Sequence, residues 1–138
     1  VNPFLKNTEK GKTKGKRMRL LLVDDEASIL EMMSEYLREA GHQVETASSV
    51  QEASERIFRK KETFDLVITD RRMPNGDGLE FMGNIQTQIS EMPVILISGD
   101  FNRNHTEFFF DDQKYFFLSK PFEWEELESI LFQIAKNE

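Results

Sequence analysis

The sequence predicts an α/β fold, a doubly wound sandwich in which a parallel five-stranded sheet is covered by helices on both faces. Three continuous apolar runs, at 20–23, 66–68 and 94–97, lack the polar alternation of a half-exposed strand. Such runs are typical of strands buried on both faces. Segments with apolar residues at helical spacing lie between them. Because strand and helix alternate five times, the pattern favours a parallel sheet with right-handed crossovers.

The first half of the chain is expected to form two strands and two helices. Ordered structure should begin near Met18, with a strand over 19–23. The helix over 27–40 should end before Gly41, which suits the position after the last helical turn. A short strand over 43–47 precedes a capping box for the next helix, with Ser49 as N-cap and Glu52 three residues later. In the first helix, apolar residues recur at helical spacing, namely Ile29, Met32, Met33, Tyr36, Leu37 and Ala40. The second helix is expected to bury Val50, Ala53, Ile57 and Phe58.

The second half adds three strands and the remaining helices. The central strand, 64–69, runs into Asp70 and a turn rich in Pro, Gly and Asn, after which Asp77 should cap a helix. A strand over 93–98 begins with proline, where strands tolerate it. Residues 99–114 are irregular in pattern, and a strand over 115–118 and a helix over 122–136 follow. The apolar stripes of these helices are Leu79, Met82, Ile85 and Ile89, and Leu127, Ile130, Leu131 and Ile134.

Size and composition are those of a single domain of ordinary size, 138 residues long. No apolar stretch approaches eighteen residues and no signal-peptide pattern is present, so we expect no membrane partner. The chain has no cysteine. This rules out disulfides and thiolate metal sites and agrees with a reducing compartment, so we expect a cytoplasmic protein.

The net charge of −7 is unevenly distributed. Residues 1–19 hold seven basic residues against one glutamate, a local charge of +6, and the remaining 119 residues therefore carry −13. Because phosphate repels a folded part this acidic, we expect no nucleic-acid binding by the domain over 18–138. Residues 1–17 are interpreted as a disordered, solvated leader or an added remnant. Contact of this leader with nucleic acid or anionic lipid is the alternative.

Polar side chains directly follow four strands of the predicted sheet. Asp24 and Asp25 come after the first strand and Asp70 after the third, and Ser98 and Lys120 end the fourth and fifth. Because parallel strands end at the same edge, these groups should converge in one shallow pocket, where open α/β sheets bind ligands. An Asp in that place acts as a nucleophile, a metal ligand or both. For Asp70 alone, the alternative is a turn-capping residue.

The charges of this cluster indicate its chemistry. Carboxylates about 4 Å apart repel by about 1 kcal/mol in water, so such a cluster either raises its pKa values or binds a cation. Oxygen ligands without nearby His or Cys favour Mg²⁺. Asp70 could then attack a phosphoryl group, with Lys120 neutralising its oxygens and Ser98 donating a hydrogen bond. Pro121 fixes the backbone beside Lys120 and could use a cis bond.

Four motifs carry a family resemblance: Leu22-Val23-Asp24-Asp25-Glu26, the run from Asp70 to Gly78, Ser98-Gly99 and Lys120-Pro121-Phe122. With these motifs, over about residues 18–136, the chain resembles the receiver domain of two-component response regulators. The resemblance implies a flavodoxin-like (βα)₅ fold with strand order 2-1-3-4-5. It also implies that Asp70 accepts a phosphoryl group from a histidine kinase or a phosphotransfer protein.

The resemblance further implies a magnesium site. Asp25 and Asp70 would ligate Mg²⁺ directly, Asp24 would act largely through water, and the backbone carbonyl of Arg72 would be a further ligand. Such a protein is not an enzyme with a separate substrate. It assists its own phosphotransfer and dephosphorylation.

The same resemblance implies a switch and a binding face. Ser98 and Lys120 would contact the phosphoryl group, and Phe117 takes the place of the aromatic switch residue. In the family, the fourth helix, fifth strand and fifth helix commonly carry dimerisation or target binding. Here that face is rich in aromatic residues, namely Tyr115, Phe116, Phe117, Phe122 and Trp124.

Two charged residues depart from the usual pattern. In this family the positions of Arg72 and Asp100 border the entrance for attacking water. We hypothesise that the two form an ion pair that hinders water and lengthens the life of the phosphorylated state. The alternative is two solvated surface charges, worth between 0 and about 1 kcal/mol.

The segment after Ser98 also departs from the family, which usually has a small-residue helix there. Asn104 and Glu107 could cap a short helix, but residues 108–110 are consecutive phenylalanines that span too wide an arc for one buried stripe. We expect at least one to be exposed or covered by a partner, or else a loop that folds one into the core. The two histidines, His42 and His105, are interpreted as solvated loop residues.

Two other classes of function are alternatives. A phosphorylation-independent protein-interaction module with the same fold is the alternative that the unusual fourth-helix segment motivates. A magnesium-dependent phosphohydrolase of the haloacid dehalogenase type is disfavoured, because it needs Asp-x-Asp after the first strand, whereas Asp24 and Asp25 are adjacent.

Overall fold

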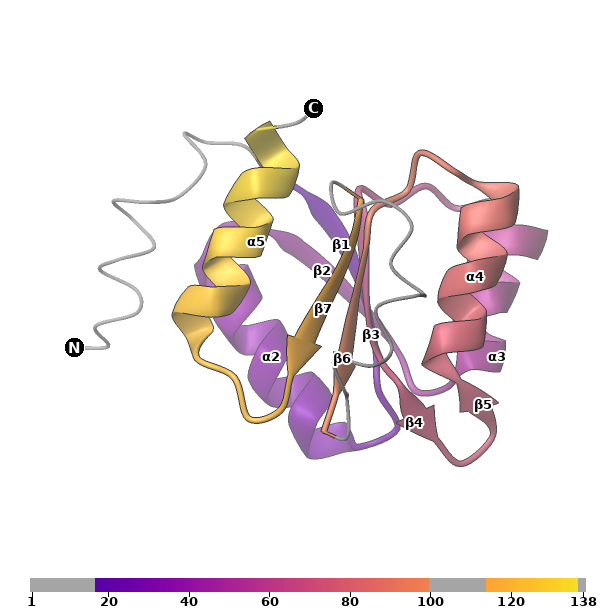
Figure 1. The fold of residues 1–138 in the computed structure, drawn as a ribbon, viewed down its shortest axis with the longest axis horizontal. Coiled ribbons are helices and arrows are strands. Elements are labelled where there is room, and N and C mark those ends of the chain that lie inside the picture. The colour runs from indigo at the N-terminus through magenta and orange to yellow at the C-terminus, as the bar shows by residue number, and fades with distance from the viewer. Residues whose placement is uncertain (1–16, 100–113, 137–138) are drawn as a thin grey trace.

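The fold is a parallel sheet between two layers of helices (Figure 1). The structure is a computed structural model that describes residues 17–99 and 114–136. Its elements are β1 (Arg19–Val23), α2 (Ala27–Glu39), β2 (Gln43–Ala47), α3 (Val50–Ser54), the π-helical η1 (Glu55–Arg59), β3 (Leu66–Asp70), β4 (Arg72–Met73), β5 (Gly76–Asp77), α4 (Gly78–Gln88), β6 (Val94–Ser98), β7 (Tyr115–Ser119) and α5 (Trp124–Lys136).

The large sheet has the order β2-β1-β3-β6-β7, and all its neighbouring strands are parallel. Counted along the chain, these five strands give the predicted order 2-1-3-4-5. Helices α2 and α5 cover one face, and α3 and α4 cover the other (Figure 1). The predicted fold class and topology are therefore confirmed. The predicted turn after Asp70 contains a small antiparallel pair, β4 with β5, that the sequence did not indicate.

The strands are buried on both faces, as their apolar runs predicted. Successive strand side chains point to opposite faces, so Leu20 and Leu22 pack under α2 and α5, whereas Leu21 and Val23 pack under α3 and α4. All four are at most 2% exposed. The sheet therefore separates two apolar cores, and its carboxyl edge is the place left for polar groups.

The end of α2 is fixed by Gly41, whose φ of 103° is in the left-handed region. The amide of His42 donates to the carbonyl of Leu37 across this turn. His42 itself corrects a prediction, because it is 7% exposed and its Nδ1 accepts a hydrogen bond from the Met18 amide. Met32, which fits the helical spacing of α2, is 48% exposed.

The helix after β2 begins as predicted and then changes its hydrogen bonding. The Ser49 Oγ accepts from the Glu52 amide at 2.9 Å, and the Glu52 carboxylate accepts from the Ser48 amide. One turn later the chain enters η1, where the Lys60 amide donates to the Glu55 carbonyl. The sequence predicted a single helix here, because a π-helical turn has no periodicity of its own in so short a segment.

Helix α4 is capped by Asp77, whose Oδ1 accepts from the Leu79 amide at 2.8 Å. Of its predicted inner face, Met82 and Ile85 are buried, and Phe81, which the predicted stripe omitted, is 0% exposed. Phe81 packs edge-on against Phe58 from η1. The apolar side of α4 is thus wider than one stripe.

The aromatic residues near the carboxyl end of the chain point in different directions. Tyr115 and Phe116 are buried on opposite faces of the sheet. Trp124 stacks on Tyr36 of α2, with ring centroids 4.2 Å apart, and Phe122 meets Trp124 edge-on. Trp124 therefore joins the start of α5 to α2, and it packs against the same core cluster as Phe116 and Leu118 of β7.

Several predictions fall outside the described residues. They concern most of the basic leader and the segment over 100–113, with Asp100, Asn104, His105, Glu107 and the phenylalanines 108–110. Within 17–99 and 114–136, no helix is both long and apolar enough to cross a membrane.

Candidate functional site

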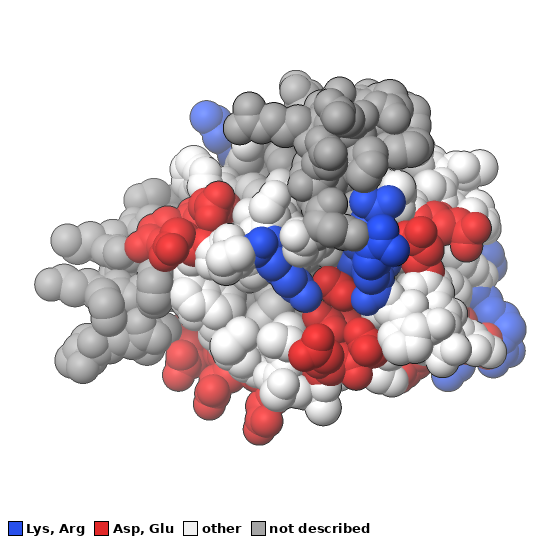
Figure 2. Space-filling model, turned by 60° about the horizontal axis from the view of Figure 1, so that its bottom comes forward, with Lys and Arg blue, Asp and Glu red and all other residues white. Residues whose placement is uncertain are grey.

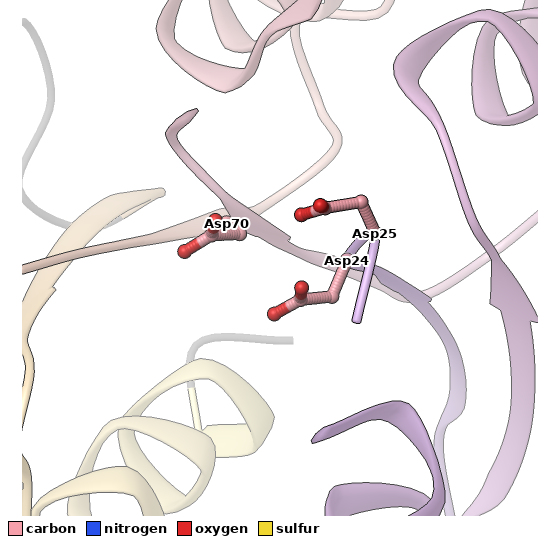
Figure 3. Close-up of side chains that lie close together, drawn as sticks. All are labelled: Asp24, Asp25 and Asp70. Carbon is pink, nitrogen blue, oxygen red and sulfur yellow. The ribbon is translucent and has the colours of Figure 1, made fainter. Parts of the chain in front are cut away.

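Three carboxylates meet at the carboxyl edge of the sheet. Asp24 and Asp25 directly follow β1, and Asp70 is the last residue of the neighbouring strand β3. Figure 3 shows the three side chains close together beside the ends of these strands. One carboxylate oxygen of each lies within 4.8 Å of the other two. The predicted convergence of these aspartates is therefore observed.

Lys120 brings a positive charge to the same place. It follows β7, and its Nζ lies 2.9 Å from Asp70 Oδ1. Its backbone amide donates to the Ser98 carbonyl at 2.9 Å, which ties the ends of β7 and β6 together. The peptide bond to Pro121 is cis, as the sequence allowed. Asp70 and Lys120 thus form a contact between residues fifty positions apart in the chain.

Ser98 ends β6 and is 3% exposed. Its neighbour in the register is Ser119 at the end of β7, while Asp70 pairs with Ile97 one strand away. Ser98 is therefore at the predicted edge, at the end of β6, the strand next to Asp70.

Asp24 is the most buried of the three aspartates, with 4% of its surface exposed. Its Oδ1 accepts a hydrogen bond from the Glu26 amide at 3.0 Å. Burial raises the pKa of the Asp24 carboxyl, and repulsion by Asp70 and Asp25 adds to this, while the Glu26 amide and Lys120 act in the opposite direction. The net effect is a raised pKa, so these surroundings disfavour a negative charge on Asp24.

The pKa of Lys120 is also raised. Burial of the ammonium lowers it, but the hydrogen bond to Asp70 and the attraction of Asp70, Asp24 and Glu26 outweigh burial. Lys120 is therefore firmly charged where it faces the carboxylates.

The backbone around Asp70 is held by close packing. The Arg71 amide donates to the Ile97 carbonyl at 2.8 Å, and the Gly78 amide donates to the Arg71 carbonyl at 2.7 Å. A Cβ on Gly78 would collide with the Asp70 carbonyl and lie 2.9 Å from the Arg71 Cα. The sequence did not predict this role of Gly78, which was named only as the end of the motif that begins at Asp70. A glycine at a helix start after a short turn was the available signal.

The remaining predicted residues are placed as follows. Arg72 is exposed on β4, two residues after Asp70. Phe117 is partly buried on β7 and packs against the core under α3 and α4. Asp100 lies outside the described residues, so its pairing with Arg72 stays a prediction.

The donor set fits a hard divalent cation. It offers carboxylate oxygens from three residues and no nitrogen or sulfur ligand, which is what Mg²⁺ prefers. The surface view agrees, with acidic side chains gathered at the centre of this face and basic ones beside them (Figure 2). Two negative charges in excess of Lys120 are what a cation would neutralise.

Comparison with protein families gives one match over most of the chain. Residues 20–132 match the model of the response regulator receiver domain. Two-component response regulator ARR12 of Arabidopsis thaliana is 30% identical over 120 residues, which are 87% of this chain and 20% of that protein. Response regulator protein PilR of Pseudomonas aeruginosa is 37% identical over 83 residues, 60% of this chain and 18% of that protein. The chain thus spans about a fifth of these two relatives.

Solved structures give the same likeness. A response regulator receiver domain protein from Clostridium thermocellum has a TM-score of 0.76 at 26% identity, with 86% of this chain and 94% of that chain covered. Response regulator TrrA of Thermotoga maritima, in complex with Mg(2+)-BeF, has a TM-score of 0.72 at 30% identity, with 84% and 97% covered.

Proposed function

The chain belongs to the response regulator receiver domain family, and on that premise we propose that Asp70 accepts a phosphoryl group in a magnesium-dependent reaction. The donor would be a phosphohistidine of a histidine kinase or a phosphotransfer protein. The observation that carries the proposal is the contact of Asp70 with Lys120 beside Asp24 and Asp25. TrrA, a structural relative that binds Mg(2+)-BeF, supports it.

The residues around Asp70 suit this transfer. An Asp70 carboxylate oxygen forms the new bond to phosphorus while the phosphorus–nitrogen bond breaks, and the leaving imidazole takes a proton from water. Lys120 faces the charge that spreads over the phosphoryl oxygens, and Ser98 offers a hydroxyl to one of them. Asp25, Asp70 and the Arg72 carbonyl would hold Mg²⁺, with Asp24 acting through water. When bound, the cation supplies further positive charge at the phosphoryl oxygens.

The test is a mass measurement after incubation with acetyl phosphate and Mg²⁺. We expect the wild-type protein to gain one phosphoryl group, and Asp70→Asn and samples with EDTA to gain none. Glu80→Gln is the matched control, because Glu80 is an exposed carboxylate outside the cluster. No gain in the wild-type protein would refute the proposal and favour the phosphorylation-independent interaction module.

We further propose that phosphorylation changes a protein-binding face that includes β7 and α5, with Phe117 as the switch residue. Phe117 lies on β7 three residues before Lys120, so a movement of Lys120 toward a phosphoryl group has a short path to it. A downstream target or a second copy would be the partner. Size-exclusion chromatography of phosphorylated wild type and of Asp70→Asn tests this, and identical behaviour with and without a target would contradict it.

The absence of cysteine supports a cytoplasmic location.

The hypothesis on Arg72 and Asp100 becomes a prediction for the phosphorylated protein. If their ion pair hinders water, Arg72→Ala loses its phosphoryl group faster, by about threefold or more for a pair worth 0.7 kcal/mol or so. The decay of the phosphorylated mass measures this. An unchanged or slower decay would contradict it.

A further inference from the structure

Strand β2 ends the sheet on one side, and among the described strands none pairs with its outer edge. The Gln43 amide donates to the Met18 carbonyl, and the Ala47 carbonyl accepts from the Asp24 amide, so these alternate residues turn their backbone groups toward β1. Val44 and Thr46 must then turn theirs outward. The Arg38 guanidinium confirms this direction, since it donates to the Val44 carbonyl at 2.8 Å. The edge thus presents the amide and carbonyl of Thr46.

A groove runs beside this edge. It has a volume of about 680 Å³ and is lined by one side of α2 and by Thr46 of β2. It is therefore next to the outward backbone groups, and its lining includes none of the three clustered aspartates that the proposed function uses.

The rim of the groove carries a regular row of carboxylates. Glu31, Glu35 and Glu39 are exposed, lie in the lining and follow one another at intervals of four residues on α2. Four residues of helix rise about 6 Å, and two residues of strand rise about 6.6 Å. The glutamates therefore match the spacing of alternate side chains on an extended peptide. The one basic residue of the lining, Arg38, already binds the Val44 carbonyl.

The wall also contains an unsatisfied hydroxyl. Ser34 lines the groove and is 3% exposed, and its Oγ has no hydrogen-bond partner in the described part of the chain. A buried hydroxyl without a partner is costly and is uncommon in native proteins. An incoming backbone carbonyl or amide that reached this hydroxyl would relieve the cost.

We propose that the outer edge of β2 and its groove bind an extended segment of a partner protein with lysines at alternate positions. The segment adds a sixth strand, and its backbone pairs with the amide and carbonyl of Thr46. Its lysines on the α2 side lie opposite Glu31, Glu35 and Glu39. This surface binds independently of phosphoryl transfer, since it shares no residue with the aspartate cluster.

The test uses a fluorescein-labelled eight-residue peptide of alternating lysine and valine, titrated with the full chain and followed by fluorescence anisotropy. We expect saturable binding to the wild-type protein. Thr46→Pro should weaken it at least tenfold, because proline removes only the outward amide and edge strands accept it. Thr46→Val, which keeps that amide, is the matched control and should bind like the wild type. An unchanged affinity of Thr46→Pro would overturn strand addition.

A second variant tests the role of the three glutamates of α2. We expect the combined Glu31→Gln, Glu35→Gln and Glu39→Gln variant to bind at least tenfold more weakly, and Glu125→Gln on α5 to bind normally. A peptide of the same composition with its lysines in one run should bind more weakly than the alternating one. Equal binding of the two peptides would reduce the effect to general charge attraction and overturn the proposed register.

Asp70→Asn should bind the peptide like the wild type, so a failure of the phosphoryl-transfer proposal leaves this measurement intact. Two further outcomes discriminate between occupants. If the peptide binds only after the lysines of residues 1–16 are replaced by glutamine, then the leader of this chain is the occupant of the β2 edge. A dimer in sedimentation that the peptide dissociates would assign it to a second copy. Either result would overturn the assignment to a partner protein.

Discussion

Asp24 illustrates, at the scale of a single residue, the conflict between stability and the proposed chemistry. Its carboxyl is buried and repelled by Asp70 and Asp25, so its pKa is raised in the folded state. A carboxyl with a raised folded pKa contributes stability only at low pH, and this contribution is lost as pH rises through the folded pKa. At neutral pH the charge of Asp24 therefore destabilises the metal-free protein.

We predict that Asp24→Asn stabilises the metal-free protein by about 1 kcal/mol at pH 7, the repulsion of one like charge about 4 Å away in water. Asparagine keeps an oxygen for the Glu26 amide, so the local backbone is preserved. Urea unfolding in EDTA measures the gain, which should vanish below pH 3.8, where the carboxyl of the unfolded chain is also protonated. Magnesium affinity, followed by tryptophan fluorescence, should fall about tenfold. A loss of stability at pH 7 would contradict this account.

Gly78 is the residue on which the position of Asp70 depends. We predict that Gly78→Ala destabilises the protein by about 2 kcal/mol or more, because its Cβ collides with backbone atoms of Asp70 and Arg71 that cannot rotate away. Gly83→Ala is the matched control, since Gly83 lies in the same helix and a Cβ there meets nothing within 4 Å. It should stabilise the protein by about 0.5 to 1 kcal/mol. Thermal unfolding of both variants measures the difference, and similar effects would contradict the role of Gly78.

Residues at strand ends could be predicted from the sequence because strand ends are local features. Asp24, Asp70 and Lys120 each follow an apolar run, and parallel topology alone brings them together. His42 and Trp124 could not be placed, because their surroundings come from residues far along the chain. His42 accepts from Met18, and Trp124 stacks on Tyr36. No local pattern contains such contacts.

At the scale of elements, α2 and α5 are joined by one aromatic contact. The Tyr36 ring stacks on Trp124, and its hydroxyl donates to Glu128 Oε2 at 2.8 Å. One side chain of α2 thus meets two turns of α5. This contact aligns the two helices that cover the same face of the sheet.

We predict that Tyr36→Phe destabilises the protein by about 1.5 kcal/mol, the lower end of the net worth of a hydrogen bond to a charged group. Phenylalanine keeps the stacking, so the change isolates the hydroxyl. Urea unfolding measures the loss. Glu128→Gln keeps an acceptor at the same place and should cost less than Tyr36→Phe. A larger loss for Glu128→Gln would mean that Glu128 stabilises the protein through contacts other than this hydrogen bond.

Element boundaries were less predictable than element types. The strand over 43–47 agrees with the observed β2, whereas the central strand begins two residues later than predicted. The π-helical η1 and the short β4–β5 pair were not predicted at all. Both depend on a single turn of hydrogen bonds, and the sequence signal of a single turn is too short to separate from that of an ordinary helix or loop.

At the scale of the whole molecule, the edge formed by the carboxyl ends of the strands and the edge formed by their amino ends are charged in different ways. The carboxyl edge gathers aspartates around Lys120. The amino edge carries a balanced network, in which Arg19 and Arg56 both contact Glu45, and Arg56 also contacts Glu62 at 2.8 Å. Both guanidinium groups lie over the ring of Phe64, which anchors the network to the core. The amino edge is therefore stabilised by charges that the proposed site does not need.

This network gives the protein a specific response to acid. Hydrogen bonds from Arg19 and then Arg56 lower the pKa of Glu45, and those from Arg56 lower that of Glu62. A carboxyl with a lowered folded pKa contributes stability above its unfolded pKa, 4.5 here, and loses it as pH falls through the lowered value. The arginines stay charged throughout this range.

We therefore predict that Glu45→Gln destabilises the protein by about 1 kcal/mol at pH 7 and that the difference fades below pH 4.5. Urea unfolding at intervals from pH 7 to pH 3 measures it. Glu55→Gln is the matched control, because its pair with Arg59 is exposed on the helix surface and should be worth only a few tenths of a kcal/mol at any pH. A constant difference between Glu45→Gln and the wild type down to pH 3 would mean that Glu45 stabilises the fold through packing, and the charge network would then not account for the response to acid.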